Sequence, residues 1–397
     1  MTRLTTLLLC ADRDKDSLQA FSSSIAGLLS SRAVLSSVGV GDSSASPTAA
    51  LILSIIQESA GRIATIIFAW RFGTSLEPEC KMYRLLADIL NDFAFVLDCL
   101  SPAFPKPVRV LILSFSSVLR ALCGVAAGSA KASLSAHFAR WGNLGELNAK
   151  DSSQETVISL LGMLVGSVVV QWVTSPFATW TTLILLLSIH LETNRRAVRA
   201  VSMRTLNRQR ANLVYHHLSQ GHVPSPKEVS TQERIFEQPG VLRGSAGEAL
   251  GVCQLGASMS TFLTSVASPH PTTKSSSVPG TALKNLLKPF HDANYVMWYD
   301  PLSFSRKVSV HIALKKDATA VDQLTAWWHA AALAEASHQQ DKPTSEKVEN
   351  DSSTLLERSM AASSTLLKKH ESALRELGWD LDTGALETGS NTRLTIK

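Results

Sequence analysis

The stretch TVISLLGMLVGSVVVQWVTSPFATWTTLILLLSIHL, residues 156–191, contains no Asp, Glu, Lys or Arg. As one straight helix it would be about 54 Å long, well beyond a hydrocarbon core of roughly 30 Å. Pro176 offers a natural break, so we expect two segments, 156–173 and 177–191, that enter a bilayer as an apolar hairpin. A buried helical hairpin in a soluble protein is the alternative. Uncharged runs of this length are rare in soluble cores, which favours the membrane.

Two features beside this run fit helices in lipid. Gly162 and Gly166 form a GxxxG motif, whose small residues let two helices approach closely. Residues 192–210 contain six Arg and one Glu. Next to an apolar hairpin, this basic segment predicts a positive flank on the cytosolic or equivalent side.

Composition limits the class of protein. The chain has 397 residues, 45% hydrophobic and 18% charged, which excludes disorder and suggests two or three domains. A net charge of +5 gives no argument for nucleic acid. The five cysteines lie far apart without a CxxC pair, which argues against a zinc site and fits a reducing compartment. No GxGxxG, P-loop, HExxH or GxSxG motif occurs, so we predict neither an enzyme nor a cofactor.

The start of the chain is atypical. Residues 4–11 are apolar, but a run of alternating acidic and basic residues follows at 12–16 without a small-residue cleavage site. This pattern argues against a secretory signal and against a transit peptide. We therefore expect a protein that is not secreted, and the sequence does not indicate which organelle contains it. Residues 1–15 are expected to be a frayed or truncated terminus.

The first half of the chain carries polar pairs at helical spacing. Glu58 and Arg62 stand at i and i+4 in an apolar helix, and in lipid they would have to face the interior of a helix bundle. The alternative is an ordinary ion pair at a surface. Asp88 and Asp92 lie one turn apart with Asn91 beside them. Two carboxylates on one face could bind a cation or carry a proton, and a salt-bridged packing surface is the alternative.

A polar segment, GNLGELNAKDSSQE at 142–155, precedes the apolar run. Ser152 and Glu155 match the S-x-x-E capping box and predict a helix start there. The remaining candidate functional residues in and before this segment are Lys131, His137, Asn143, Asn148, Lys150 and Asp151.

The second half reads as a linker and a small domain. Residues 216–289 are rich in Pro, Ser and Gly, with a low-complexity insertion at 269–280. From about 290, alternating residues at 308–314 predict a strand, with 295–299 as its partner. Thr319 and Asp322 fit a capping box for a helix that carries Trp327 and Trp328 as core residues. A second helix is expected to stop at Gly378, and 393–397 to add a last strand.

The residues resemble a known family, the root UVB sensitive (RUS) family of eukaryotic proteins. The resemblance is carried by DSLQAFSSSIAGLLSSRAVLSSVGVGD (16–42), AGRI and FAWRFG near 60–73, ADILND (87–92), AKASLSAHFARWGNLGELNAKDSSQETVISLLGMLVGS (130–167) and the LGW-D turn at 377–380. The resemblance implies a membrane protein, like plant members linked to UVB responses, pyridoxal phosphate homeostasis and auxin transport. It implies no catalytic residues.

These observations predict a mainly α protein. A helical membrane-associated domain at 16–215 is followed by the linker and by an α+β domain at 290–397. We expect a non-enzymatic integral membrane protein, either a scaffold or a carrier of a small metabolite, that pairs with itself or with a family relative. The alternative is a peripheral or soluble adaptor whose apolar hairpin is buried against such a relative.

Overall fold

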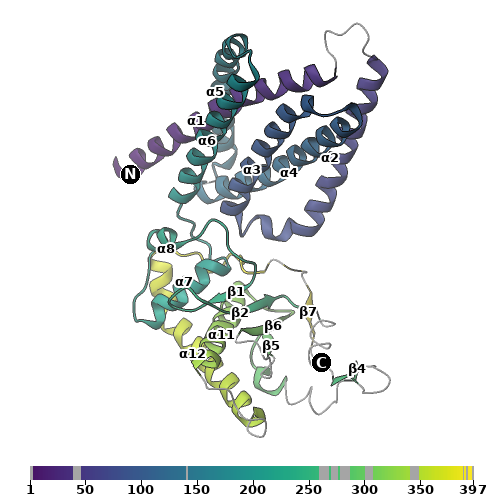
Figure 1. The fold of residues 1–397 in the computed structure, drawn as a ribbon. Helices are drawn as coiled ribbons and strands as arrows, with labels where there is room; N and C mark the ends of the chain where they lie inside the picture. The colour runs from purple at the N-terminus through teal and green to yellow at the C-terminus, as the bar shows by residue number, and fades with distance from the viewer. Residues whose placement is uncertain are drawn as a thin grey trace. The chain divides into compact units, whose positions relative to one another are not determined.

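The computed structural model describes residues 3–38, 46–139, 142–258, 287–299, 307–339, 348–387 and 392–395, with 268–269, 276–277 and 389 (Figure 1). The chain divides into two compact units, residues 1–201 and 202–397. The boundary expected near residue 215 therefore lies earlier. Helix α7 (Arg208–Ser219) belongs to the second unit because its Ala211 and Val214 are buried in that unit's core.

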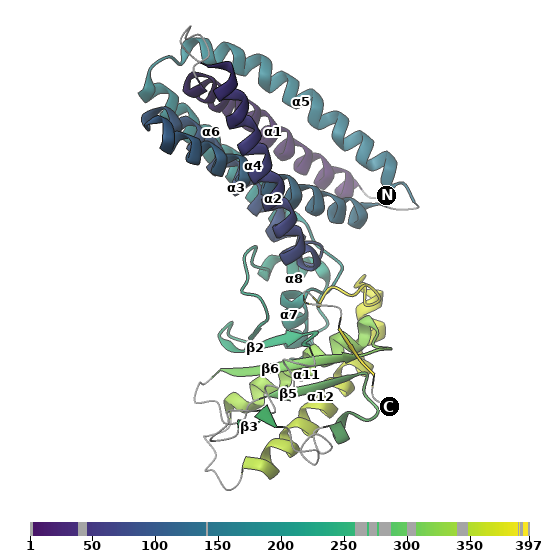
Figure 2. The ribbon, with the colours of Figure 1, turned by 90° about the vertical axis from the view of Figure 1, so that its right-hand side faces the viewer.

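The first unit is entirely helical in its described residues. Helix α1 packs against α3, α5 and α6, and α4 packs against α3 and α2 (Figure 2). The expected break at Pro176 is present, since Pro176 begins a new helix and Ser175 Oγ accepts a hydrogen bond of 3.1 Å from the Ala178 N–H. The start of the chain, expected to be frayed, is helical from Arg3. The helices are α1 (Arg3–Val38), α2 (Pro47–Leu76), α3 (Cys80–Leu100), α4 (Lys106–Phe138), α5 (Leu144–Trp172) and α6 (Pro176–Ala200).

The GxxxG motif lies where α5 meets α1. A Cβ on Gly162 would stand 2.8 Å from Ser24 Cβ and 3.0 Å from the carbonyl oxygen of Phe21. A Cβ on Gly166 would stand 3.2 Å from Ile25 Cα. Both glycines therefore allow a backbone approach that any larger residue would prevent, as the motif predicts.

The second unit combines a sheet with helices. The sheet has the strand order β1-β2-β6-β5, and β7 pairs in parallel with the end of β6. The predicted pairing of 295–299 with 308–314 is confirmed as an antiparallel ladder in which Tyr295 faces Leu314. The elements after α7 are α8 (Pro226–Gln232), β1 (Val241–Arg243), β2 (Ala249–Leu255), β3 (Ser268–Pro269), β4 (Ser276–Ser277), β5 (Tyr295–Tyr299), β6 (Val308–Lys315), α11 (Ala320–Gln339), α12 (Val348–Glu376) and β7 (Arg393–Leu394).

Helix α11 supplies the centre of this unit's core. Trp327 and Trp328 are fully buried, as the sequence predicts. Their indole N–H groups donate to Asn212 Oδ1 at 2.8 Å and to the Ala211 carbonyl at 2.9 Å, so they also fasten α7 to the core. The capping box is present as well, because the Thr319 N–H donates to Asp322 Oδ2 and the Asp322 N–H donates to Thr319 Oγ1.

The segment expected as a linker contributes to the fold. Strands β1 and β2 lie inside 216–289, and their Leu242, Leu250 and Cys253 are buried in the core. Strand β2 pairs in parallel with β6, which begins more than fifty residues later. The sequence does not predict β2 because ALGVCQL is short, contains Gly251 and is followed directly by Gly256. The expected insertion at 269–280 lies outside the described residues, except for the paired β3 and β4.

Candidate functional site

Helix α3 carries a line of buried carboxylates along one side. Asp88, Asp92 and Asp98 are each at most 6% exposed, and they recur about every one to two helical turns. Asp88 and Asp92 face α1 and α6, and Asp98 faces α1 and α4, so the acidic groups lie inside the helical unit rather than on its surface. Buried ionised groups need partners, and the neighbouring helices provide them.

Asp88 is held by three helices. Arg84, one turn earlier on α3, donates to Asp88 Oδ1 at 3.1 Å, and Asn194 of α6 donates to Oδ2 at 2.6 Å. Gln19 of α1 also donates to Oδ2, while its own carbonyl oxygen accepts from Arg84 at 3.1 Å. Asp88 is thus a fully compensated charge at the junction of α1, α3 and α6.

Asp92 has a different environment. Its Oδ1 lies 2.7 Å from Nδ1 of His190, a residue of α6 that is 2% exposed. The other ring nitrogen of His190 is 3.5 Å from both Asp88 Oδ2 and Gln19 Nε2. Asp92 Oδ2 is buried and accepts no hydrogen bond from any described residue. We call Gln19, Arg84, Asp88, Asp92, His190 and Asn194 the polar cluster.

A second buried network lies further along α3. Arg120 of α4 contacts the Asp98 carboxylate, and Ser30 of α1 donates to the same oxygen at 2.7 Å. Arg120 also donates to Ser30 at 3.0 Å and lies over the Phe95 ring. These groups tie α1, α3 and α4 together and are satisfied by one another, which is the pattern of a packing network.

The polar cluster can hold or move a proton. An imidazole that contacts two carboxylates can exchange a proton with either of them, and Asp92 Oδ2 has unused capacity to accept one. Among the described residues, no group of three His, Cys, Asp or Glu is placed to hold a metal ion. An imidazole beside two carboxylates supports proton or polar-ligand chemistry.

The structure places the other predicted residues elsewhere. The expectation that Glu58 and Arg62 face the bundle interior is wrong: they pair at 3.2 Å, but their side chains are 71% and 76% exposed, because Gly61 is the residue that turns toward α4. Asn91 is half-buried and takes no part in the contacts of the polar cluster.

The polar segment at 142–155 does not start a helix at Ser152. Helix α5 begins at Leu144, with Asn143 at its N-cap position, so Ser152 and Glu155 lie within the helix. Lys131 of α4 bridges to Asp151 at 2.8 Å and to Glu155 at 2.9 Å.

The other candidates near this segment are local. Lys150 pairs with Glu146 on the exposed side of α5. Asn148 is half-buried on the same helix, and His137 stacks edge-on against Phe138 at the end of α4. Of the predicted site residues, only Asp88 and Asp92 enter the buried polar cluster.

Four of the six cluster residues are not among the residues that the sequence predicts for a site. His190 was treated as part of the apolar run, although it is the only titratable side chain between Thr156 and Leu191. Gln19 and Asn194 lie about seventy and one hundred residues from Asp88, and no spacing rule connects residues that far apart. A lone histidine in an uncharged helix was the one usable signal.

Two family models match the chain. One, described as the vitamin B6 photo-protection and homoeostasis domain, matches residues 14–222. The other, described as the C-terminal region of root UVB sensitive protein, matches residues 274–390. The whole polar cluster lies in the first match, while β1, β2 and α8 lie between the two.

Comparison with known proteins gives relatives with the same family name. RUS family member 1 of Dictyostelium discoideum is 42% identical over 226 residues, which cover 56% of this chain and 43% of the relative. Protein root UVB sensitive 3 of Arabidopsis thaliana is 34% identical over 223 residues, which cover 56% of this chain and 50% of the relative. Protein root UVB sensitive 6 of Arabidopsis thaliana is 26% identical over 375 residues, 91% of this chain and 69% of the relative.

The chain spans about half the length of the first two of these relatives. No solved structure matches it. The first family model alone covers more than half of the chain, and the second covers most of the remainder. The chain therefore belongs to the root UVB sensitive family.

Proposed function

We propose that this chain is an integral membrane protein that carries a small metabolite of the vitamin B6 class, with the polar cluster as its working site. The observation that carries the proposal is a buried acid–imidazole pair, Asp92 and His190, inside a helical unit whose outer surface is apolar. Ionisable groups inside such a bundle are costly and typically mark substrate or proton paths.

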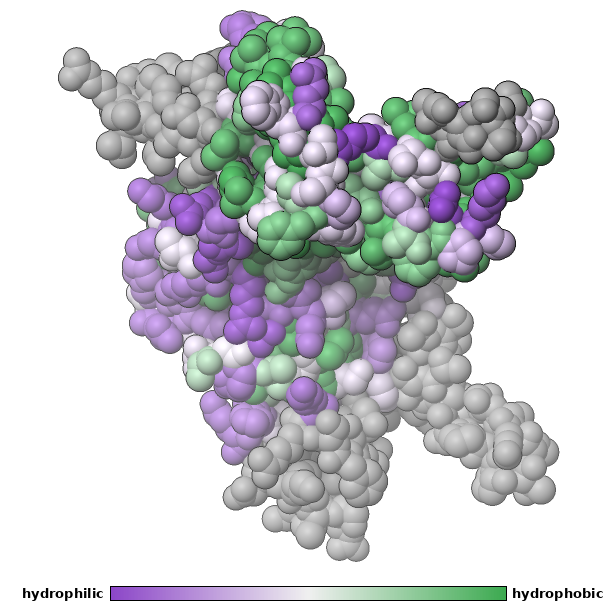
Figure 3. All heavy atoms as spheres, turned by 45° about the horizontal axis from the view of Figure 1, so that its top comes forward, coloured by the Kyte–Doolittle hydropathy of each residue, from purple (hydrophilic) through white to green (hydrophobic). Residues whose placement is uncertain are grey.

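The surface of the first unit supports the membrane setting. Among its described residues, three helices are long and apolar enough to span a bilayer: Thr48–Leu76, Lys106–Phe138 and Leu144–Trp172. Their apolar side chains point outward, for instance Ile66, which is 68% exposed, and Leu111, which is 70% exposed. Figure 3 shows hydrophobic residues gathered on this unit. Exposure of an apolar surface of this extent to water is unfavourable in free energy, whereas contact with lipid is not.

Aromatic residues at helix ends fit the same setting. Trp70 near the end of α2 and Trp172 at the end of α5 are 83% and 82% exposed, and Phe177 at the start of α6 is 81% exposed. Exposed Trp side chains gather at the boundary between hydrocarbon and headgroups, because the ring is apolar and its N–H is polar.

The chemistry of the polar cluster suits a cargo with a basic nitrogen. Asp92 Oδ2 can accept a hydrogen bond from a protonated ring nitrogen or from an amine. Vitamin B6 compounds carry a pyridine nitrogen, and the description of the matching family model names vitamin B6 homoeostasis. This link to the cargo comes from the family model, while the acceptor comes from the structure.

Transport by the full chain in liposomes tests the proposal. We expect uptake of pyridoxal or pyridoxal 5′-phosphate by the wild type, loss of uptake in Asp92→Asn and Asp88→Asn, and normal uptake in Asp151→Asn, whose carboxyl is exposed. All variants should keep wild-type helicity, since Asn is close to Asp in shape. Uptake by Asp92→Asn at the wild-type rate would refute the carrier role.

Extraction with alkaline carbonate separates the two settings first. Retention in the membrane pellet is expected if the apolar helices are inserted. Release into the supernatant would instead favour the adaptor, in which a relative from the same family covers the apolar helices of the first unit. If the protein is retained, Cys253 can be labelled from one side of the membrane after the second unit alone is unfolded, because the residue is buried in the folded unit. This labelling would report on which side of the membrane the second unit lies.

A further inference from the structure

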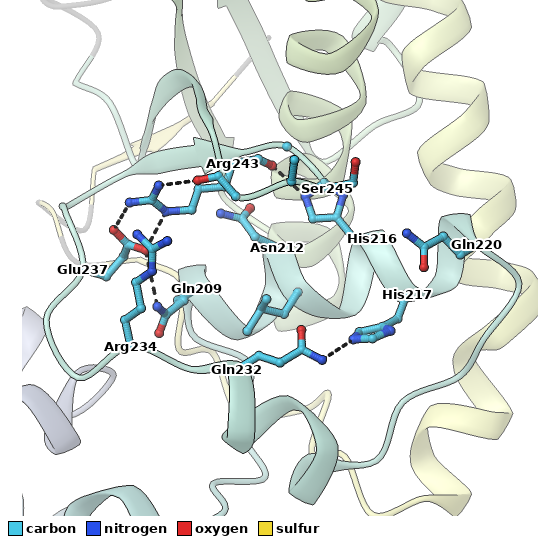
Figure 4. A pocket seen from close by; sticks show the side chains of 14 residues that line it. Gln209, Asn212, His216, His217, Gln220, Gln232, Arg234, Glu237, Arg243 and Ser245 are labelled. Atoms are coloured by element: carbon cyan, nitrogen blue, oxygen red, sulfur yellow. Dashed lines mark hydrogen bonds and ion pairs between the residues drawn. The ribbon is translucent and has the colours of Figure 1, made fainter. Parts of the chain in front are cut away.

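A pocket in the second unit lies on one face of α7. Its volume is about 380 Å³, within the range of small-molecule sites. Gln209, His216, His217 and Gln220 recur along this face at helical spacing (Figure 4), and the apolar Leu213 of the same helix also lines the pocket. The pocket is also lined by Gln232 at the end of α8, by Arg234 and Glu237 after it, and by the turn at 243–247 between β1 and β2.

The acidic group of the pocket is already neutralised. Arg243 donates to both oxygens of Glu237, at 2.7 Å and 2.6 Å, and Gln209 donates to the same carboxylate at 3.4 Å. Burial raises the pKa of Glu237, but hydrogen bonds from Arg243 and from the Gln238 N–H, with the charges of Arg243 and Arg234, shift it below its usual range. Glu237 is therefore an ionised partner of Arg243 and adds no net charge.

One cation of the pocket remains without such a partner. Arg234 is exposed, and its guanidinium makes no hydrogen bond or ion pair with any residue that the structure describes. A Cβ on Gly247 would stand 3.7 Å from Arg234 NH2, so the guanidinium lies beside the 244–247 turn. A guanidinium offers two parallel N–H donors, which match the geometry of a phosphate or carboxylate.

The turn opposite Arg234 offers donors of its own. The Gly247 N–H donates to the Gly244 carbonyl at 2.9 Å, and Gly247 has a positive φ of 83°. Within the described part of the chain, the backbone N–H groups of Ser245 and Ala246 donate to no other residue. Backbone N–H groups at a tight turn are frequent donors to anions.

The histidines complete the lining. The Gln232 amide nitrogen lies 3.1 Å from His217 Nε2, which holds this ring at the edge of the pocket. His216 is fixed in place, with Nε2 2.6 Å from the Arg243 carbonyl and Nδ1 3.1 Å from Glu335. The pocket thus presents several donors, two arginines against one carboxylate, and the apolar side chain of Leu213.

We propose that this pocket binds a small organic phosphate, with Arg234 and the 244–247 turn holding the phosphate and Leu213 lying under its organic part. The proposal does not depend on the membrane role, because every group it uses lies in the second unit. It also adds a ligand site in a region between the two family-model matches, since Arg234 and the turn lie between residues 222 and 274.

Binding to the full-length protein in detergent tests the proposal. The probes are pyridoxal 5′-phosphate, pyridoxal and inorganic phosphate, measured by calorimetry. We expect the phosphate ester to bind at least about tenfold more tightly than pyridoxal, since the phosphate supplies charge-assisted hydrogen bonds. Pyridoxal binding as tightly as its phosphate ester, or no binding of any phosphate probe, would overturn the proposal.

Variants locate the site. Arg234→Gln should weaken binding of the phosphate ester about tenfold or more, and Arg234→Lys should lose less because it keeps the charge. Arg358→Gln is the matched control, since Arg358 is an exposed residue of α12 outside the pocket. Equal affinity in Arg234→Gln and Arg358→Gln would overturn the assignment. Because transport is measured separately with Asp92→Asn, this failure is distinguishable from failure of the carrier role.

Discussion

Asp92 of α3 and His190 of α6 meet inside the helical unit, with 2.7 Å between Asp92 Oδ1 and His190 Nδ1. Both side chains are at most 5% exposed. Nearly one hundred residues separate them in sequence, so the contact exists only when α3 and α6 are packed together. The pair therefore reports directly on the assembly of the polar cluster.

Removal of the imidazole should destabilise the first unit. His190→Leu leaves Asp92 buried without its partner, and breaking a buried pair in this way costs about 3–5 kcal/mol. The double variant Asp92→Leu/His190→Leu should recover part of this loss because no unpaired charge remains. Unfolding followed by far-ultraviolet circular dichroism in detergent measures both. Asn91→Leu is the control, and a His190→Leu protein as stable as this control would contradict the expectation.

Close packing of α5 on α1 gives a second prediction. Gly162→Ala places a methyl group 2.8 Å from Ser24 Cβ and near the Phe21 carbonyl, so the helices must move apart. We expect a loss of about 1–3 kcal/mol in the free energy of unfolding. Gly128→Ala on α4 is the matched control, since nothing lies within 4 Å of its added Cβ. Its higher helix propensity should stabilise by up to about 1 kcal/mol. Equal changes in the free energy of unfolding for Gly162→Ala and Gly128→Ala would show that α1 and α5 leave room for a methyl group at residue 162.

The second unit should lose stability in mild acid. Burial lowers the pKa of His329 from its ordinary value of 6.5 to about 4. The neutral ring is satisfied, with Nε2 donating to the Leu356 carbonyl at 3.0 Å and Nδ1 accepting from the Tyr295 hydroxyl at 3.0 Å. In the unfolded chain His329 binds a proton near pH 6.5, whereas in the folded chain it binds one only near pH 4. Stability therefore falls as the pH drops from about 6.5 to 4, by about 3 kcal/mol in all.

His329→Gln tests this pH dependence. It keeps a donor for Leu356 but cannot titrate, so the pH dependence of unfolding should flatten between pH 4 and 6.5. Near-ultraviolet circular dichroism of the buried tryptophans follows the second unit. His291→Gln, which changes an exposed ring, should keep the wild-type slope. A slope unchanged in His329→Gln would rule out His329 as its source.

Local patterns predicted the elements whose signals are local. The alternation at 308–314, the capping box of Thr319 and Asp322, and the break at Pro176 each depend on residues within one turn or one strand, and all three are present. The same capping pattern at Ser152 and Glu155 was misleading, because α4 provides Lys131 as a tertiary partner for Glu155. A side chain that could cap a helix can equally form a bridge to another helix.

Contacts between distant residues explain what the sequence could not show. The short strand β2 is stabilised by pairing with β6, and residues between them give no sign of this register. The spacing of Asp88 and Asp92 predicted that these two residues of the polar cluster share one side of α3. Gln19 and Asn194 contact Asp88 only because α1 and α6 pack on α3. For Glu58 and Arg62 the sequence correctly predicted a pair one helical turn apart. That spacing alone does not determine which side of α2 is buried, and the pair is exposed.

The exposed pair on α2 separates a lipid setting from an aqueous one. In water, Glu58 and Arg62 contribute about 0.3–0.5 kcal/mol, so Glu58→Gln, Arg62→Gln and the double variant should behave alike. In a bilayer, Glu58→Gln leaves an unpaired arginine near the middle of a candidate span, at a cost of about 2.5–3.5 kcal/mol for insertion. We expect Glu58→Gln alone to reduce the carbonate-resistant fraction of the protein, and the added Arg62→Gln change to restore it. Identical fractions for all three variants would mean that α2 does not lie in lipid, because only there does a lone charge carry that cost.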